Sequence, residues 1–127
     1  MVKVHKAADG KLKQTVEVRG HQWSADVSTE LGGDDAGPDP HELLNAALGA
    51  CTALTVTMVA RRKQMALTDV VVQITHEEGG GVCRMHRQIE LVGDLNEEQR
   101  QYLLGIANKC PVHKTLMGRF EIDTTLA

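Results

Sequence analysis

The stretch LLNAALGACTALTVTMVA, residues 43–60, contains no charged residue over 18 consecutive positions. About 20 apolar residues are needed to span a bilayer, so a transmembrane helix is one interpretation of this stretch. Asn45, Thr52, Thr55 and Thr57 interrupt it, however, and its alanines and glycine make it only mildly hydrophobic. We therefore expect a helix that is buried on nearly all sides in the core of a soluble protein.

A buried helix of this kind has to be covered by the rest of the protein. The chain has 127 residues, which predicts one domain, residues 1–127. A domain of this size has little surface with which to wrap a helix completely. A second copy of the chain can complete the wrapping, so we expect a homodimer.

Composition narrows the class of protein. Hydrophobic residues make up 42% of the chain and charged residues 24%, which is typical of a soluble globular protein. The net charge of −3 and the presence of only one Trp, one Tyr and one Phe argue against nucleic-acid binding. The beginning of the chain, VKVHKAADGK, has no apolar segment typical of an export signal. Three cysteines, an odd number, suit a reducing compartment. We therefore expect a cytoplasmic protein that does not bind a membrane.

Turn signals and apolar patterns divide the chain into elements. Short runs broken at Asp9-Gly10 and Arg19-Gly20 predict an antiparallel meander, and the loop after it is rich in glycine and proline. The meander strands are expected at 2–8, 12–19 and 21–27, and the loop at 28–40.

The remaining elements begin with a helix from Pro40, capped by Asp39, to about Arg62. A strand pair follows, and the sequence NEEQ resembles a capping box that starts a second helix. The later elements are expected at 67–77 and 82–92 (strands), 96–109 and 111–117 (helices) and 119–126 (a last strand). Because strands and helices are segregated rather than alternating, we predict an α+β fold.

The stretch NKCPVHKTL, residues 108–116, contains a cysteine that is a candidate for chemistry. Pro111 ends the preceding helix at Cys110, so the thiol lies at the start of the next helical segment. Free backbone N–H groups there favour a thiolate, and Lys109 and Lys114 add positive charge nearby, as does His113 when it is protonated.

The other two cysteines give weaker signals. Cys51 lies in the middle of the uncharged stretch, where an inert, packed cysteine is the commoner outcome. Cys83 lies beside a glycine-rich hairpin, and the sequence shows no partner for it. A metal site is an alternative, because Cys110 and His113 have C-x2-H spacing and His41 or Cys51 could add ligands. Zinc normally needs four ligands, and no second paired element is visible.

Two motifs together resemble the OsmC/Ohr family. One is GPDPHELLNAALGACTALTV, in which a cysteine follows the loop proline by eleven residues, and the other is the C-P-V-H stretch. The resemblance runs from about Leu31 to Leu126 and is weaker in the first thirty residues. It is closest to the less characterised OsmC-like branch of the family.

The resemblance implies a fold and an activity. It implies an intertwined dimer in which strands of both subunits wrap two central helices. It also implies a thiol peroxidase that acts on organic hydroperoxides without a metal or an organic cofactor, with electrons from an external dithiol. By the resemblance, Cys51 attacks the peroxide and Cys110 closes a disulfide with it. The chain supplies leucines and methionines for an apolar pocket, which an alkyl hydroperoxide requires.

The chain departs from the family pattern at two places. Well-characterised peroxidase members have a glutamate directly after the loop proline, where this chain has His41, and Glu42 follows one residue later. Those members also use an arginine in an early turn, where Lys11 is the nearest cation here and Arg19 is a possible substitute. At 1.5 Å per residue, His41 and Glu42 start about 13–15 Å from Cys51 along a straight helix.

Two other functions remain open from the sequence. One is a non-enzymatic protein that binds a small apolar ligand at the dimer interface. The other is a structural zinc protein. Loss of free thiols with peroxide distinguishes the enzyme from both.

Overall fold

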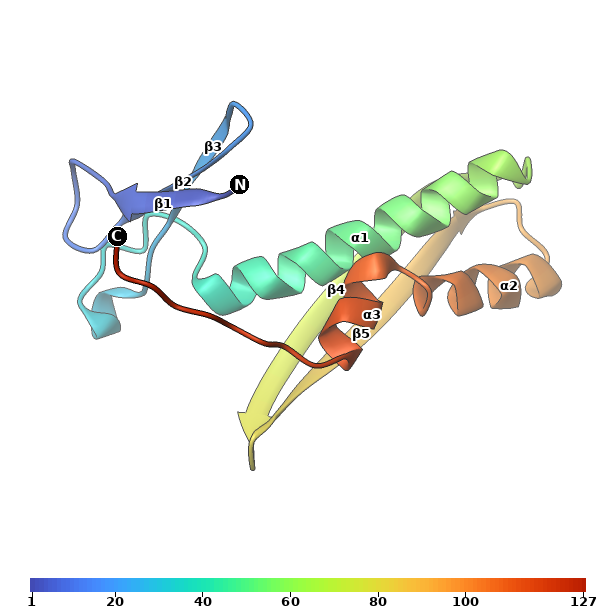
Figure 1. Cartoon of the computed structure of the whole chain (residues 1–127). Coiled ribbons are helices and arrows are strands. Elements are labelled where there is room, and N and C mark those ends of the chain that lie inside the picture. Colours follow the sequence, from blue (N-terminus) through green and yellow to red (C-terminus); the bar gives the residue numbers. More distant parts are fainter. The chain divides into compact units, whose positions relative to one another are not determined.

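Three antiparallel strands begin the chain: β1 (Lys3–Lys6), β2 (Gln14–Val18) and β3 (His21–Ala25), in the sheet order β1-β2-β3 (Figure 1). The computed structural model describes all 127 residues, and these strands belong to the first of two units, residues 1–44. Arg19 and Gly20 connect β2 to β3 with φ values of 47° and 84°. Positive φ at both positions is typical of a tight hairpin turn, so the predicted meander is confirmed.

The loop after β3 is organised around one carboxylate. Asp26 is only 4% exposed and accepts hydrogen bonds from the backbone N–H groups of Val27 (2.8 Å), Asp34 (3.2 Å) and Ala36 (3.1 Å). A side chain at Gly33 would place its Cβ 2.3 Å from the carbonyl oxygen of Val27, so only glycine fits there. The loop also contains a short 3-10 turn, η1 (Thr29–Leu31), where the sequence predicted no regular structure.

Helix α1 (Pro40–Arg62) begins as predicted. The Asp39 carboxylate accepts from the backbone N–H of Glu42 at 2.9 Å, and the Glu42 carboxylate accepts from the backbone N–H of Asp39 at 3.1 Å. This reciprocal pair satisfies donors that the first helical turn leaves free, with Pro40 at the first helical position, where it needs no donor.

The second unit, residues 45–127, is built on a long hairpin of β4 (Leu67–Gly79) and β5 (Val82–Gly93) (Figure 1). Gly80 and Gly81 form its tip, both with positive φ. Helix α2 (Glu97–Ala107) follows, and it begins at the predicted capping box of Asn96 and Gln99. Helix α3 (Pro111–Met117) completes the regular structure.

The core of this unit lies where α1 and α2 pack on the hairpin. Its buried centre includes Val56 and Ala60 of α1 and Leu103 of α2. Partly buried side chains of the hairpin pack against it: Leu67, Val70, Ile89 and Leu91. Each element therefore contributes one apolar face to the core.

Helix α1 is less covered than the sequence led us to expect. Within this chain its buried residues form a single stripe with a spacing of four: Leu48, Thr52, Val56 and Ala60. Leu54 and Met58 remain 63% and 58% exposed. By length and composition alone α1 also has what a membrane span requires, a test that core helices of soluble proteins pass as well. The expectation of burial on nearly all sides is therefore wrong for one chain taken alone.

Two predicted boundaries also differ. Helix α2 ends at Ala107 rather than at about Lys109, because the chain turns before Pro111. Residues 118–127 form no strand, although the sequence predicted one at 119–126. A strand is stabilised by its neighbour, and no segment of this chain pairs with the tail.

Candidate functional site

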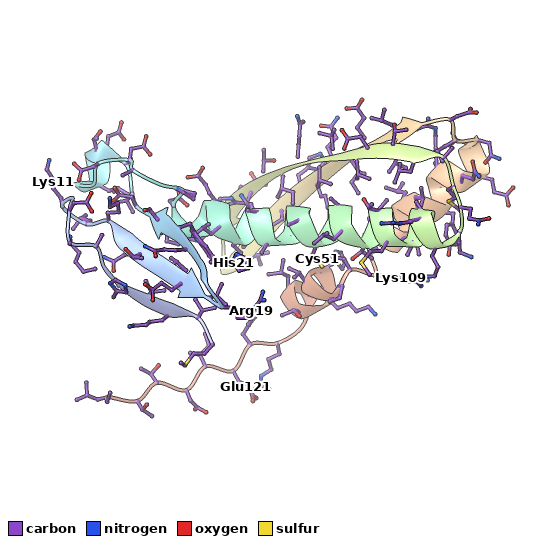
Figure 2. The ribbon with its side chains drawn as sticks, turned by 90° about the horizontal axis from the view of Figure 1, so that it is seen from above. Lys11, Arg19, His21, Cys51, Lys109 and Glu121 are labelled. Atoms are coloured by element: carbon purple, nitrogen blue, oxygen red, sulfur yellow. The ribbon has the colours of Figure 1, made fainter.

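The three cysteines have different environments. Cys51 lies on α1 and is half-buried, Cys83 is exposed near the tip of the β4–β5 hairpin, and Cys110 is buried directly before α3. Figure 2 shows Cys51 on α1 and Lys109 at the turn through which the chain enters α3. Only Cys51 and Cys110 are therefore candidates for a shared site.

Cys110 is enclosed by groups from two helices. Its Sγ accepts a hydrogen bond from the backbone N–H of His113 at 3.2 Å, as the N-cap of α3. On its other side, Sγ lies 3.9 Å from the hydroxyl oxygen of Thr52 on α1. Thr52 directly follows Cys51, so the fold brings Cys110 next to the helical turn that carries Cys51.

Cys51 is the more accessible of the two. Its Sγ lies 4.0 Å from the hydroxyl oxygen of Thr55, one turn further along α1. It is half-buried, whereas Cys110 has no exposed surface. A small reagent from solvent therefore meets the sulfur of Cys51 before that of Cys110.

Arg87 of β5 ties the surroundings of Cys110 together. Its Nη1 donates to the Thr52 hydroxyl at 2.9 Å and to the carbonyl oxygen of Ala107 at 3.2 Å. Its Nη2 donates to the Asn108 side-chain oxygen at 2.7 Å and to His113 Nδ1 at 3.3 Å. The guanidinium thus contacts α1 and both sides of the Cys110 turn, and all of these acceptors are neutral.

Sequence reasoning missed Arg87, although a signal was present. Burial alternates along β5, and Arg87 falls on the same side as Met85, Ile89 and Leu91, while His86 and the other intervening residues are exposed. An arginine on the apolar side of a strand requires buried acceptors, and these are now seen.

The contact between Arg87 and His113 places a permanent charge beside the imidazole. Nδ1 can accept from Arg87 only when it carries no proton. The permanent positive charge at the Cys110 turn is therefore that of Arg87.

No group of three or more His, Cys, Asp or Glu side chains is placed to hold a metal ion. The zinc alternative lacks its ligands in this chain.

The other predicted site residues belong to the first unit. Glu42 caps α1 through the backbone N–H of Asp39, and Arg19 is an exposed turn residue. The backbone N–H of Lys11 donates to the Asp34 carboxylate at 2.9 Å. His41 lies in the exposed first turn of α1. Their predicted roles beside Cys51 remain predictions.

A cavity of about 600 Å³ lies between α1 and β4 in the second unit. Most of its lining residues are small or aliphatic, but the polar Asn45 and the charged Asp69 also line it. The small and aliphatic residues are Ala46, Gly49, Ala50, Ala53, Val70, Val71, Val72 and Ile74. Asn45 Nδ2 lies 2.7 Å from His76 Nδ1, and its side-chain oxygen is buried without a hydrogen-bond partner. The cavity therefore presents a mostly apolar surface along one side of α1, with polar groups at Asn45 and Asp69.

The chain matches known proteins at the level of family and fold. The sequence model of a family described as OsmC-like protein matches residues 32–125. A comparison with curated proteins gave no match. The fold is therefore α+β and OsmC-like, as predicted.

Several solved structures are similar. A protein from Psychrobacter arcticus described as a putative osmotic stress induced and detoxification response protein has 19% identity over 90% of this chain and 85% of its own, with a TM-score of 0.77. An OsmC-like protein from Mycoplasma pneumoniae has 18% identity over 93% and 86%, with a TM-score of 0.77. An organic hydroperoxide resistance protein from Legionella pneumophila has 21% identity over 93% and 88%, with a TM-score of 0.66.

Proposed function

Because the chain belongs to the OsmC-like protein family, we propose that it is a cysteine-based peroxidase that reduces organic hydroperoxides. The observation that carries the proposal is the position of Cys110, buried against Thr52, the residue after Cys51. The Legionella structure, whose name includes organic hydroperoxide resistance, supports the substrate class.

The proposed reaction has three balanced steps. The Cys51 thiolate attacks the outer peroxide oxygen, the O–O bond breaks, and the alcohol leaves with a proton, which gives a sulfenic acid on Cys51. Cys110 then attacks the Cys51 sulfur and water leaves, which gives a Cys51–Cys110 disulfide. An external dithiol reduces the disulfide, supplies two electrons and restores both thiols.

Access and burial fit this division of roles. Cys51 is half-buried, so peroxide can reach it, whereas Cys110 has no exposed surface and is shielded from over-oxidation. His113 is a supporting residue, because its backbone N–H binds the Cys110 sulfur. His41, Glu42, Lys11 and Arg19 are proposed as further supporting residues on the family resemblance alone.

We also propose that the chain forms a homodimer. The exposed side of α1 carries Leu54 and Met58, and the mostly apolar cavity lies along the same helix. The tail adds the exposed apolar residues Phe120, Ile122 and Leu126. A second copy can cover these surfaces, and its sheet can pair with a tail that has no partner in its own chain.

The protein is proposed to work in the cytoplasm as one OsmC-like domain, with no metal or organic cofactor. Three cysteines, an odd number, suit a reducing compartment.

Consumption of a bulky alkyl hydroperoxide, with dithiothreitol as reductant, tests the function. Cys51→Ser is expected to abolish turnover, and Cys110→Ser is expected to stall as a sulfenic acid and then over-oxidise. Cys83→Ser is the matched control, because the proposed reaction steps do not use this exposed cysteine.

Peptide mapping after one equivalent of hydroperoxide tests the pairing. An intrachain Cys51–Cys110 disulfide is expected. A disulfide that includes Cys83, a link between two chains, or undiminished turnover in Cys51→Ser contradicts the assigned roles. Affinity for an apolar ligand without any turnover would indicate the non-enzymatic binder instead.

A further inference from the structure

We propose that the Thr52 hydroxyl, held by Arg87, controls the protonation of Cys110: it accepts from the resting thiol and donates to the thiolate as Cys110 attacks Cys51. This inference rests on the proposed pairing of Cys51 with Cys110. It assigns a role to two residues that the three reaction steps do not use.

The Thr52 hydroxyl already has two hydrogen-bond partners besides Cys110. A hydroxyl has one proton to donate and two positions at which it can accept. The Thr52 hydroxyl donates to the carbonyl oxygen of Leu48 at 2.7 Å and accepts from Arg87 Nη1 at 2.9 Å. One accepting position remains, and the Cys110 sulfur lies 3.9 Å away. When the hydroxyl proton is on the Leu48 carbonyl, this position accepts the S–H of a Cys110 thiol.

Burial keeps water from adding further hydrogen bonds to Thr52 and Cys110. Thr52 and Cys110 both have 0% exposure, so bulk water does not replace either partner. A buried polar group without a partner is costly, so the hydroxyl, the sulfur and the guanidinium constrain one another.

The hydrogen bonds of Thr52 change during the reaction. Before Cys110 attacks Cys51 its thiol loses its proton, and the hydroxide that the attack displaces from Cys51 takes up one proton and leaves as water. While Cys110 is a thiolate, Thr52 can turn its hydroxyl proton from Leu48 to the sulfur by rotation about one bond. The carbonyl oxygen of Leu48 still accepts the backbone N–H of Thr52 in the helix ladder, so this rotation leaves no buried acceptor unpaired.

Arg87 makes this exchange favourable. Its charge is permanent, and its hydrogen bonds go only to neutral acceptors, so no carboxylate neutralises it. Because it donates to the Thr52 oxygen, it polarises the O–H bond and strengthens its donation to a negative sulfur. Its bonds to Asn108 and His113 also hold the Cys110 turn from both sides. Thr52 contacts the reacting sulfur, whereas Arg87 acts through Thr52 and is a positioning residue.

The test measures the attack of Cys110 without peroxide. The full chain with Cys83→Ser is treated with 4,4′-dithiodipyridine, which forms a mixed disulfide on Cys51 and releases one thiopyridone. Attack by Cys110 on the Cys51 sulfur then releases a second thiopyridone and closes the disulfide. The rate of the second release, measured against pH, reports the thiolate of Cys110 alone.

We expect Thr52→Val and Arg87→Met to slow the second release by roughly tenfold at neutral pH and to move its pH profile upward, with the first release nearly unchanged. Thr52→Ser and Arg87→Lys should restore most of the rate, because they keep the hydroxyl and the charge. Arg84→Met is the matched control on the exposed side of β5.

The proposal is overturned if Thr52→Val and Arg87→Met keep the wild-type closure rate and pH profile. It is also overturned if Thr52→Ser loses as much rate as Thr52→Val, because that result would indicate a packing role for Thr52. Absence of a second release in the Cys83→Ser protein also overturns it. A hydroperoxide assay of the same proteins is run in parallel. If only the proposed peroxidase function is wrong, hydroperoxide is not consumed but the second thiopyridone is still released.

Discussion

Asp26 lies at a crowded turn of the backbone. The N–H groups of Val27, Ala36 and Asp34 donate to its carboxylate and hold its pKa below the ordinary value, with Val27 contributing most. Burial of the carboxylate raises its pKa, but by less than the hydrogen bonds lower it. Because the folded pKa is lowered, the ionised carboxylate stabilises the fold above the unfolded value of about 3.8, and this stabilisation disappears as the pH falls through the folded pKa.

Asp26→Asn is therefore expected to lower the free energy of unfolding at pH 7 and to have a much smaller effect at pH 3. Urea unfolding of both proteins between pH 3 and pH 7 measures this difference. Asp35→Asn is the control, because Asp35 is an exposed residue of the same loop. A difference that stays constant with pH would show that Asp26 acts by shape rather than by charge.

Single residues also show the limit of sequence reasoning at the site. Cys51, Cys110 and His113 were predicted as site residues because their motifs are contiguous in the sequence. Arg87 was not, because its partners Thr52 and Asn108 lie 35 and 21 positions away and meet only in the fold. The alternation along β5 indicates an inward arginine, but it does not say what the guanidinium binds.

Element boundaries were predictable where local chemistry sets them. Asn96 accepts from the backbone N–H of Gln99 at 2.8 Å, and the Gln99 side chain accepts from the backbone N–H of Asn96 at 3.0 Å. The capping box of Asp39 and Glu42 works in the same way. Such pairs are three residues apart, so they are visible in the sequence before any tertiary contact is known.

Asn96→Ala is expected to reduce the free energy of unfolding by about 1 kcal/mol, because it removes the N-cap of the helix that leads to Cys110. Asn96→Ser should recover most of this loss. Thermal and urea unfolding of the two variants measure it, with the exposed Glu98→Gln as the control on the same turn. An Asn96→Ala protein as stable as the wild type would show that α2 is held by its packing alone.

At the scale of the whole molecule, local signals were insufficient. A strand was predicted at 119–126, yet residues 118–127 have no pairing partner in the chain. Helix α1 was expected to be buried on nearly all sides, yet only its stripe of four residues is buried. Both differences have one physical cause. A strand and an apolar helix each require a covering surface, and a single chain of this size does not supply it.

The proposed dimer explains both differences and gives a test. Leu54 is 63% exposed in the single chain, so Leu54→Lys should be harmless to a monomer. In a dimer that covers α1, the same change places an uncompensated charge in a dry interface, which costs several kcal/mol. We expect the wild type to have a dimeric mass by light scattering at micromolar concentration and Leu54→Lys to dissociate or to lose its fold.

Gln101→Lys, which adds the same charge to an exposed position of α2, should stay dimeric. A wild type that is monomeric and folded at this concentration would contradict the dimer, and the exposed side of α1 would then need another partner.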